Sequence, residues 1–280
     1  MVPLNLLIDG KTAEFIYTGT WVKKAIADAE KMGATRTIWS GEAENFTRIP
    51  GNDEYRVGDD AAYLHICGNE TIGGIEYHQY PDAGAVPLVA DMSSHIMSRP
   101  IEWDKLDLAF AGAQKNLGPA GLALVIVHKE LLEKCKDRLP AYLSYKTHAG
   151  KDSLYNTPPV FAVYMMKLTV DWVKSQGGLA EMEKRALTRS SAIYDTIDHS
   201  DGWYRCPVDK ASRSRMNVCF RLPTEDLEAK FIAEALEANF SGLKGHRSVG
   251  GCRASMYNAM PVEGAERLAD FMLKFKQKNA

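Results

Sequence analysis

The chain has 280 residues, of which 45% are hydrophobic and 25% are charged. This length and composition are sufficient for a full hydrophobic core and predict a globular protein of two domains. The net charge is only −2, and neither a long basic stripe nor an aromatic-rich RNA-binding motif is present, which argues against a nucleic-acid-binding protein.

The N-terminal ten residues contain a short apolar run that Pro3, Asn5 and Asp9 interrupt, with no basic residues before it. They predict neither a signal peptide nor a membrane span. The five cysteines are widely spaced and form no CxxC pair, so we expect free thiols in a reducing cytoplasm. The seven histidines show no metal-ligand spacing, and no metal site is predicted.

Strand-like and helical patterns alternate along the first part of the chain. Strands are predicted at residues 15–18, 35–39, 61–67, 88–91, 108–112 and 122–128, with an amphipathic helix over 21–32. A further helix over 160–176 ends at Gly177 and Gly178, because glycines are a typical C-terminal stop. This alternation is typical of an α/β fold, in which helices cover a mostly parallel sheet.

The pattern changes after Gly178. Charged helices are predicted over residues 179–198, 224–239 and 262–278, and strands over 216–222 and 254–257. We therefore expect a large domain at 1–176 and a smaller C-terminal α+β domain at 177–280.

Lys115 lies in a turn of small residues between two runs that both read as buried strands, residues 108–112 and 122–128. A lysine among apolar and small neighbours loses hydration, which favours its neutral, nucleophilic amine. The commoner alternative is a solvated turn lysine.

Asp91 ends the apolar run over residues 86–91. Ligands bind at the carboxyl ends of parallel strands, and a carboxylate there can hold a protonated pyridine nitrogen. On the sequence alone, Asp91 could equally cap the turn that follows it. Together, Asp91 and Lys115 indicate a site in which the carboxylate pairs with a ring nitrogen and the amine reacts with an aldehyde carbon.

Six motifs in chain order carry a resemblance to a known enzyme family. They lie at residues 63–75, 90–94, 111–121, 155–159, 212–217 and 243–260. The chain resembles the phosphoserine aminotransferases, which are pyridoxal 5'-phosphate (PLP) enzymes of the aspartate aminotransferase-like fold, fold type I.

The resemblance implies a role for each residue of the cofactor site. Lys115 would form the internal Schiff base with PLP and then move the proton between substrate and cofactor. Asp91 would pair with the pyridinium nitrogen, Thr71 would bond near the ring hydroxyl, and Trp21 would stack on the ring. Gln114 would reach the cofactor phosphate.

The resemblance also implies a homodimer, since Asn156 and Thr157 would contact that phosphate from the neighbouring subunit. His246, Arg247 and Arg253 would receive the anionic substrate. The expected reaction transfers the amino group of L-glutamate to 3-phosphohydroxypyruvate and gives O-phospho-L-serine, a step of serine biosynthesis. The resemblance also allows 4-phosphohydroxythreonine as a substrate, in pyridoxine biosynthesis.

From the residues alone, several of these side chains could instead have a purely structural role. Trp21 could be a core side chain, and Thr71 could satisfy backbone groups locally. The residues from Asn156 to Pro159 signal a helix start, whose N–H groups would also favour a phosphate. The cationic loop at 244–253 could be solvated, although two arginines among glycines suit a small anion.

The sequence departs from the family at its N-terminus. The family's leading segment, with its serine-glycine-proline motif, histidine-arginine pair and phosphate-binding loop, has no counterpart in the 280 residues. We therefore expect an N-terminally truncated chain that binds PLP more loosely. Two alternatives remain: a catalytically inactive homologue that folds and dimerises, and another fold-type I PLP enzyme with a different anion pocket.

Overall fold

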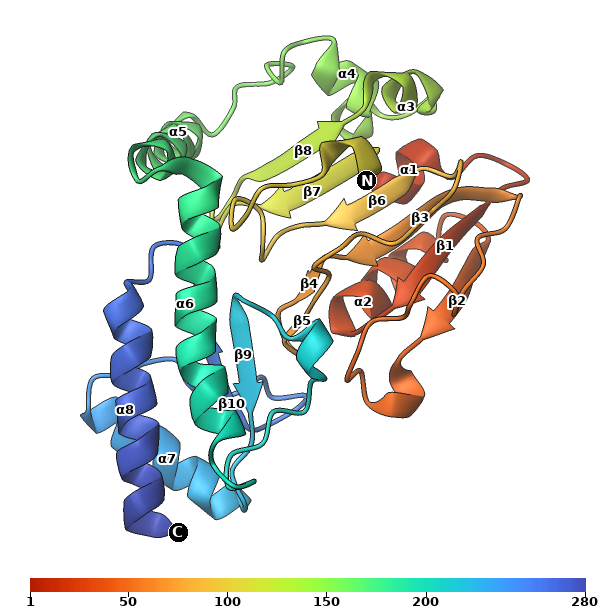
Figure 1. Cartoon of the computed structure of the whole chain (residues 1–280). Helices are drawn as coiled ribbons and strands as arrows, with labels where there is room; N and C mark the ends of the chain where they lie inside the picture. The colour runs from red at the N-terminus through yellow and green to blue at the C-terminus, as the bar shows by residue number, and fades with distance from the viewer.

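Six strands form the central sheet, in the order β2-β1-β3-β6-β7-β8 (Figure 1). The computed structural model describes all residues, 1–280. The strands are β1 (Thr12–Tyr17), β2 (Thr35–Ser40), β3 (Ala61–Cys67), β6 (Leu88–Asp91), β7 (Leu108–Gly112) and β8 (Ala123–Val127). The first five are parallel and β8 pairs antiparallel with β7, so the prediction of an α/β fold with a mostly parallel sheet is confirmed.

Alternate residues of these strands enter two different apolar clusters, as the pleat of a sheet requires. On one face, Phe15 and Tyr63 pack with α1 (Val2–Leu6), α2 (Thr20–Ala29), α3 (Lys129–Lys134) and α4 (Tyr145–Ala149). On the other face, Ile16 and Leu64 pack with apolar side chains from residues 77–117 and with Met166 of α5 (Val160–Ser175). Both faces of the central strands β1, β3 and β6 are therefore largely covered, whereas the edge strand β8 is more open.

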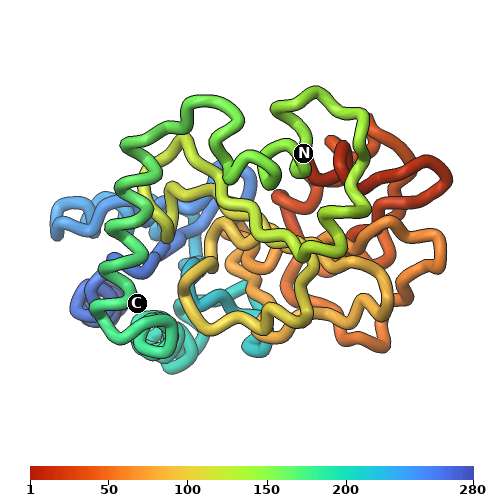
Figure 2. The backbone as a smooth tube through the Cα atoms, turned by 90° about the horizontal axis from the view of Figure 1, so that it is seen from above, coloured from red at the N-terminus to blue at the C-terminus, as the bar shows by residue number.

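The C-terminal part of the chain builds its own core at the other end of the molecule (Figure 2). It contains α6 (Gly178–Asp198), α7 (Glu225–Glu237), α8 (Val262–Asn279) and the antiparallel pair β9 (Asn217–Phe220) and β10 (Cys252–Ser255). All buried members of this cluster lie between Ile193 and Phe275. The domain boundary between 176 and 177 stays a prediction.

Several details differ from the sequence-based expectations. The strand β8 was expected to be buried, but it lies at the edge of the sheet and the other segments leave the side chains of Val125 and Ile126 exposed. The strand expected at 254–257 is β10, two residues earlier in the chain. The short helices α1, α3 and α4 and the hairpin of β4 (Asn69–Glu70) and β5 (Ile75–Glu76) were not predicted. Elements this short have little periodicity and depend on tertiary packing.

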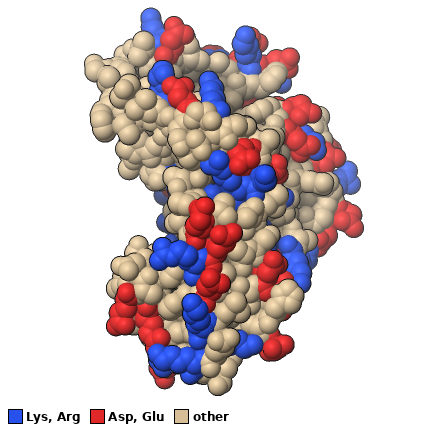
Figure 3. All heavy atoms as spheres, turned by 60° about the vertical axis from the view of Figure 1, so that its left-hand side comes forward, with Lys and Arg blue, Asp and Glu red and all other residues tan.

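Basic and acidic side chains are interspersed over both lobes of the face in Figure 3. This mixture agrees with the small net charge. None of the helices combines the length and the apolar composition that a bilayer span needs.

Candidate active site

Three of the predicted site residues meet at the carboxyl ends of the parallel strands. Asp91 is the last residue of β6, Lys115 lies in the turn after β7, and Thr71 follows β4, which comes directly after β3. Because β3, β6 and β7 run parallel and adjacent, their carboxyl ends bring these segments to one edge of the sheet. This edge is where open α/β sheets bind ligands.

Lys115 is half-buried and its amine has a defined partner. Its Nζ donates a hydrogen bond to Oγ1 of Thr71 at 2.7 Å and lies 5.6 Å from the centroid of the Trp21 ring. Burial lowers the pKa of Lys115 from its usual value, while Asp91 and Cys67 act in the opposite direction. The solvated turn lysine, the commoner alternative, does not describe this geometry. The amine is therefore partly desolvated beside a flat aromatic face, a setting that favours nucleophilic chemistry.

The turn that carries Lys115 owes its shape to small residues. Gly118 has a φ of +154°, and a Cβ there would come within 3.3 Å of the Met166 backbone in α5. A larger residue at position 118 would therefore strain the backbone and push α5 away from the turn by a few tenths of an ångström.

The carboxylate of Asp91 has two functions available. Oδ1 accepts a hydrogen bond from the backbone N–H of Ser93 at 2.8 Å, so the turn-capping role expected as an alternative is present. Burial raises the pKa of Asp91, and the nearby ammonium of Lys115 lowers it. A desolvated carboxylate of this kind is stabilised by a cationic N–H group, such as a protonated heterocyclic nitrogen.

Trp21 lies at the start of α2 and is half-buried. Its indole Nε1 is buried without a hydrogen-bond partner. A buried indole N–H usually finds a partner, so this donor is free for a group that the chain itself does not supply.

Glu70 also belongs to this group of residues, although sequence reasoning did not single it out. It is fully buried, directly precedes Thr71, and interacts electrostatically with both Asp91 and Lys115. The sequence did contain a signal for Glu70, because it is an acidic residue next to a predicted buried strand. A carboxylate buried at such a position needs a specific partner, which marks it as a candidate site residue.

Arg253 brings a cation from β10 to the same place. Its NH1 donates to the backbone oxygen of Thr71 at 3.3 Å, and its Nε is buried without a partner. Arg253 also lines a cavity of about 460 Å³ between the sheet part and the C-terminal part, together with Ile72 and Arg221. Arg221 is already paired with Glu228 at 2.8 Å, so Arg253 is the guanidinium at this cavity with a donor left for a small anion.

Five predicted site residues make no hydrogen bond, ion pair or ring contact with Lys115, and none of them is among the main groups that shift its pKa. They are Gln114, Asn156, Thr157, His246 and Arg247. The exposed Gln114 folds its side chain over Gly112, and Asn156 bonds only to the backbone oxygen of Thr157. The His246 ring bonds to Ser248 in its own loop. The helix start that residues 156–159 signalled is confirmed, since α5 begins at Val160, but its N-cap is Pro159 and neither Asn156 nor Thr157 caps it.

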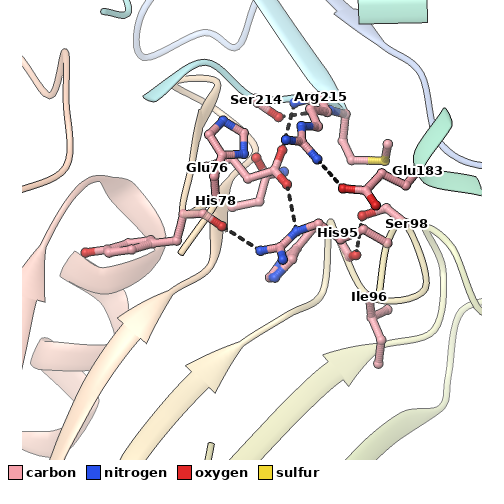
Figure 4. A network of polar contacts seen from close by, with 12 residues as sticks. Glu76, His78, His95, Ile96, Ser98, Glu183, Ser214 and Arg215 are labelled. Carbon is pink, nitrogen blue, oxygen red and sulfur yellow. Dashed lines mark hydrogen bonds and ion pairs between the residues drawn. The ribbon is translucent and has the colours of Figure 1, made fainter. Parts of the chain in front are cut away.

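A buried polar network fastens the C-terminal part to the sheet part close to this site (Figure 4). Glu76 of β5 is fully buried and accepts a hydrogen bond from the backbone N–H of Arg215 at 2.7 Å. The guanidinium of Arg215 bonds to Glu183 of α6 at 2.7 Å, and Arg99 lies 3.7 Å from Glu76. The network therefore holds β9 and, through it, β10 and Arg253 in register with the strand ends.

Comparison with known proteins agrees with this geometry. The profile of the aminotransferase class-V family matches residues 11–268. A phosphoserine aminotransferase of Geobacillus kaustophilus is 49% identical over 280 residues, which are 100% of this chain and 78% of the relative. The chain belongs to the phosphoserine aminotransferase family.

Solved structures of this family have the same fold. The chain superposes on phosphoserine aminotransferase from Bacillus circulans subsp. alkalophilus with a TM-score of 0.97 and 46% identity, covering 100% of this chain and 77% of the other. PLP-bound phosphoserine aminotransferase from Trichomonas vaginalis gives a TM-score of 0.90 and 36% identity, covering 97% of this chain and 78% of the other.

The residues of this site fit PLP. The fit rests on a half-buried amine at Lys115, a desolvated carboxylate at Asp91 and an aromatic face with an unpartnered N–H at Trp21. These three groups match an aldehyde, a pyridinium nitrogen and a flat ring, respectively.

Proposed function

We propose that this chain transfers the amino group of L-glutamate to 3-phosphohydroxypyruvate with PLP as cofactor, giving O-phospho-L-serine for serine biosynthesis. The observation that carries the proposal is the half-buried amine of Lys115, which is bonded to Thr71, lies 5.6 Å from the centroid of the Trp21 ring and has its pKa raised by the nearby Asp91 carboxylate against the effect of burial. The family supports both the cofactor and the reaction, because curated relatives about half identical to the chain are phosphoserine aminotransferases.

Each residue contributes a separate part of the chemistry. When bound, PLP supplies an aldehyde that accepts an amine and a ring that withdraws electrons from the substrate carbon. The Nζ of Lys115 would supply the amine that binds the aldehyde carbon and the base that moves the proton of the substrate carbon. Asp91 would hold a proton on the ring nitrogen, and the Trp21 ring would exclude water from one face.

The anionic substrate would be received by Arg253 at the 460 Å³ cavity. Its fork-shaped guanidinium suits the paired oxygens of a carboxylate or phosphate, and its Nε has no partner within the chain. His246 and Arg247 would add two basic side chains from a loop that is free of acidic residues. Gln114 would contact the cofactor phosphate.

A homodimer is part of the proposal, because Asn156 and Thr157 would reach the cofactor of the neighbouring subunit. The exposed apolar surface of α5 supports it: Val160 is 65% exposed and Phe161 is 72% exposed, with Val163, Tyr164 and Leu168 on the same helix also exposed. An apolar helix face of this kind is typical of an interface between subunits. The five free cysteines support a cytoplasmic location.

Covalent trapping tests the proposal directly. The chain is mixed with PLP, reduced with borohydride and digested, and the modified peptide is identified by mass spectrometry. We expect the label on Lys115 and none in Lys115→Ala. Lys24→Ala is the matched control, since the Lys24 amine lies 4.6 Å from the same Trp21 ring and should not be needed.

Turnover of L-glutamate with 3-phosphohydroxypyruvate should accompany the label and disappear in Lys115→Ala. A label on another lysine, or a folded dimer that takes up no label, would overturn the proposal. Equal turnover of an unphosphorylated 2-oxo acid would contradict the assigned substrate.

A further inference from the structure

The carboxylate of Glu70 is bound to the beginning of a distant helix. Its Oε1 accepts hydrogen bonds from the backbone N–H groups of Trp21 at 3.1 Å and Val22 at 3.0 Å, and its Oε2 lies 3.1 Å from the same Trp21 N–H. The N-cap residue of α2 is Gly19, which has no side chain to cap the helix. Glu70, 49 positions along the chain from Trp21, therefore caps α2 in its place.

Gly19 gives independent evidence that this contact is built into the fold. A Cβ at Gly19 would lie 2.7 Å from Cδ and 2.9 Å from Oε2 of Glu70. Such distances are too short for carbon and oxygen atoms that are not bonded, so only a glycine admits the carboxylate here. The helix α2 therefore begins without a cap of its own, and the glycine at its N-cap leaves space for the carboxylate of Glu70.

We propose that Glu70 is a positioning residue of the active site, whose carboxylate fixes the N-terminus of α2 and thereby holds the Trp21 ring beside Lys115. The backbone N–H of Trp21 is bonded to Glu70, while its ring lies 5.6 Å from the Lys115 amine. This inference rests on the proposed function only in assigning the Trp21 ring to the cofactor.

Glu70 also contributes charge to the site. Burial raises the pKa of Glu70 to about 7, although the hydrogen bonds that it accepts from two backbone N–H groups act to lower it. The titratable groups that interact with it are Asp91, Lys115, Cys67 and Tyr77. Among them, Lys115 is the cation, and the negative charge of Glu70 acts to raise the pKa of the Lys115 amine.

The first test follows the Trp21 ring in the chain without added PLP. The indole N–H signal of Trp21 is identified by NMR as the one of five tryptophan signals lost in Trp21→Phe. Glu70→Ala should shift or broaden this signal, because the start of α2 loses its cap. Gly19→Ala should do the same by displacing the carboxylate. Gly73→Ala is the matched control, since a Cβ there meets only Ile75 at 3.9 Å.

The second test separates charge from shape. Glu70→Gln keeps an oxygen that accepts the two N–H groups, so the Trp21 signal should remain close to that of the unmodified chain. The pH profile of Lys115 labelling by reductive methylation should nevertheless move to lower pH, because a negative neighbour is lost. A residue that only filled space would not change this profile.

PLP titration completes the experiment. Glu70→Ala should weaken PLP binding about tenfold, the loss expected when hydrogen bonds to a charged acceptor are removed. If Glu70→Ala does not fold, Gly19→Ala and Glu70→Gln decide the question.

The inference is overturned if Glu70→Ala and Gly19→Ala both keep the Trp21 signal of the unmodified chain. An unmodified chain that takes up no PLP would instead contradict the proposed function. In that case the Trp21 signal still decides the role of Glu70.

Discussion

The Nζ of Lys115 donates a hydrogen bond to Oγ1 of Thr71 at 2.7 Å, across 44 positions of sequence. The backbone oxygen of the same threonine accepts a hydrogen bond from Arg253 of β10 at 3.3 Å. Thr71 therefore connects the Lys115 amine of the sheet part with the Arg253 guanidinium of the C-terminal part. A substitution at Thr71 can remove the contact with Lys115 while it keeps the backbone oxygen that accepts from Arg253.

Replacing Thr71 with valine should lower the pKa of Lys115 further, because the hydroxyl that accepts from its ammonium group is lost. The pH dependence of Lys115 labelling measures this change. Thr71→Ser keeps the hydroxyl and is the control. Identical profiles for the valine and serine variants would show that the hydrogen bond does not act on the amine.

Replacing Arg253 with alanine should raise KM for the phosphorylated 2-oxo acid about tenfold or more, the cost of losing a charge-assisted contact. PLP loading should change little. Steady-state kinetics and PLP titration measure the two effects separately. Arg267→Ala, at an exposed arginine of α8, is the control. Parallel loss of PLP and substrate binding would contradict the substrate role of Arg253.

Replacing Phe161 with lysine should dissociate the proposed homodimer, because a charge would be placed in the apolar surface of α5. Sedimentation velocity should show the mass falling from a dimer to a monomer. The control is Leu236→Lys on α7, where Leu236 is 63% exposed, close to the 72% of Phe161. An unmodified chain that sediments as a monomer would contradict the dimer itself.

The buried pair of Glu76 and Arg99 should be costly to break. Arg99→Ala removes the ion-pair partner of the fully buried Glu76 and leaves Arg215 as the remaining nearby cation, so it should lower the free energy of unfolding by about 3 kcal/mol. The double variant Glu76→Gln with Arg99→Ala should lose less than the two single variants together. Urea unfolding measures all of them, and strictly additive losses would show that the two side chains are not coupled.

His65 should make the chain sensitive to acid. Burial between Phe15 and Phe110 lowers its pKa from 6.5 to about 4, so the folded state resists taking up the proton. Below pH 6.5 the unfolded state binds more protons, and His65 costs stability as the pH falls to about 4, by about 1.4 kcal/mol for each pKa unit.

His65→Phe should therefore flatten the pH dependence of the unfolding free energy between pH 6.5 and about 4. Phe110→Leu disturbs the same aromatic stack without removing a titrating group, so it should lower stability at every pH by a similar amount. Equal slopes for His65→Phe and the unmodified chain would contradict the assignment.

The sequence alone determined the elements whose pattern is local. Apolar runs that alternate with helical patterns predicted the parallel strands, and the glycine pair at Gly177 and Gly178 predicted the end of α5 close to its observed last residue, Ser175. The motifs around Asp91 and Lys115 likewise indicated a family, because they depend on residue order and not on folding. These features require only neighbours along the chain.

The tertiary structure alone decided which distant groups meet. The hydrogen bond between Lys115 and Thr71, the capping of α2 by Glu70 and the approach of Arg253 each join segments that no periodicity connects. The burial of Glu70 and the exposure of β8 depend on which surfaces the other segments cover. Desolvation and hydrogen-bond partners are properties of packing in three dimensions, so the pKa values and the site geometry follow only from the folded chain.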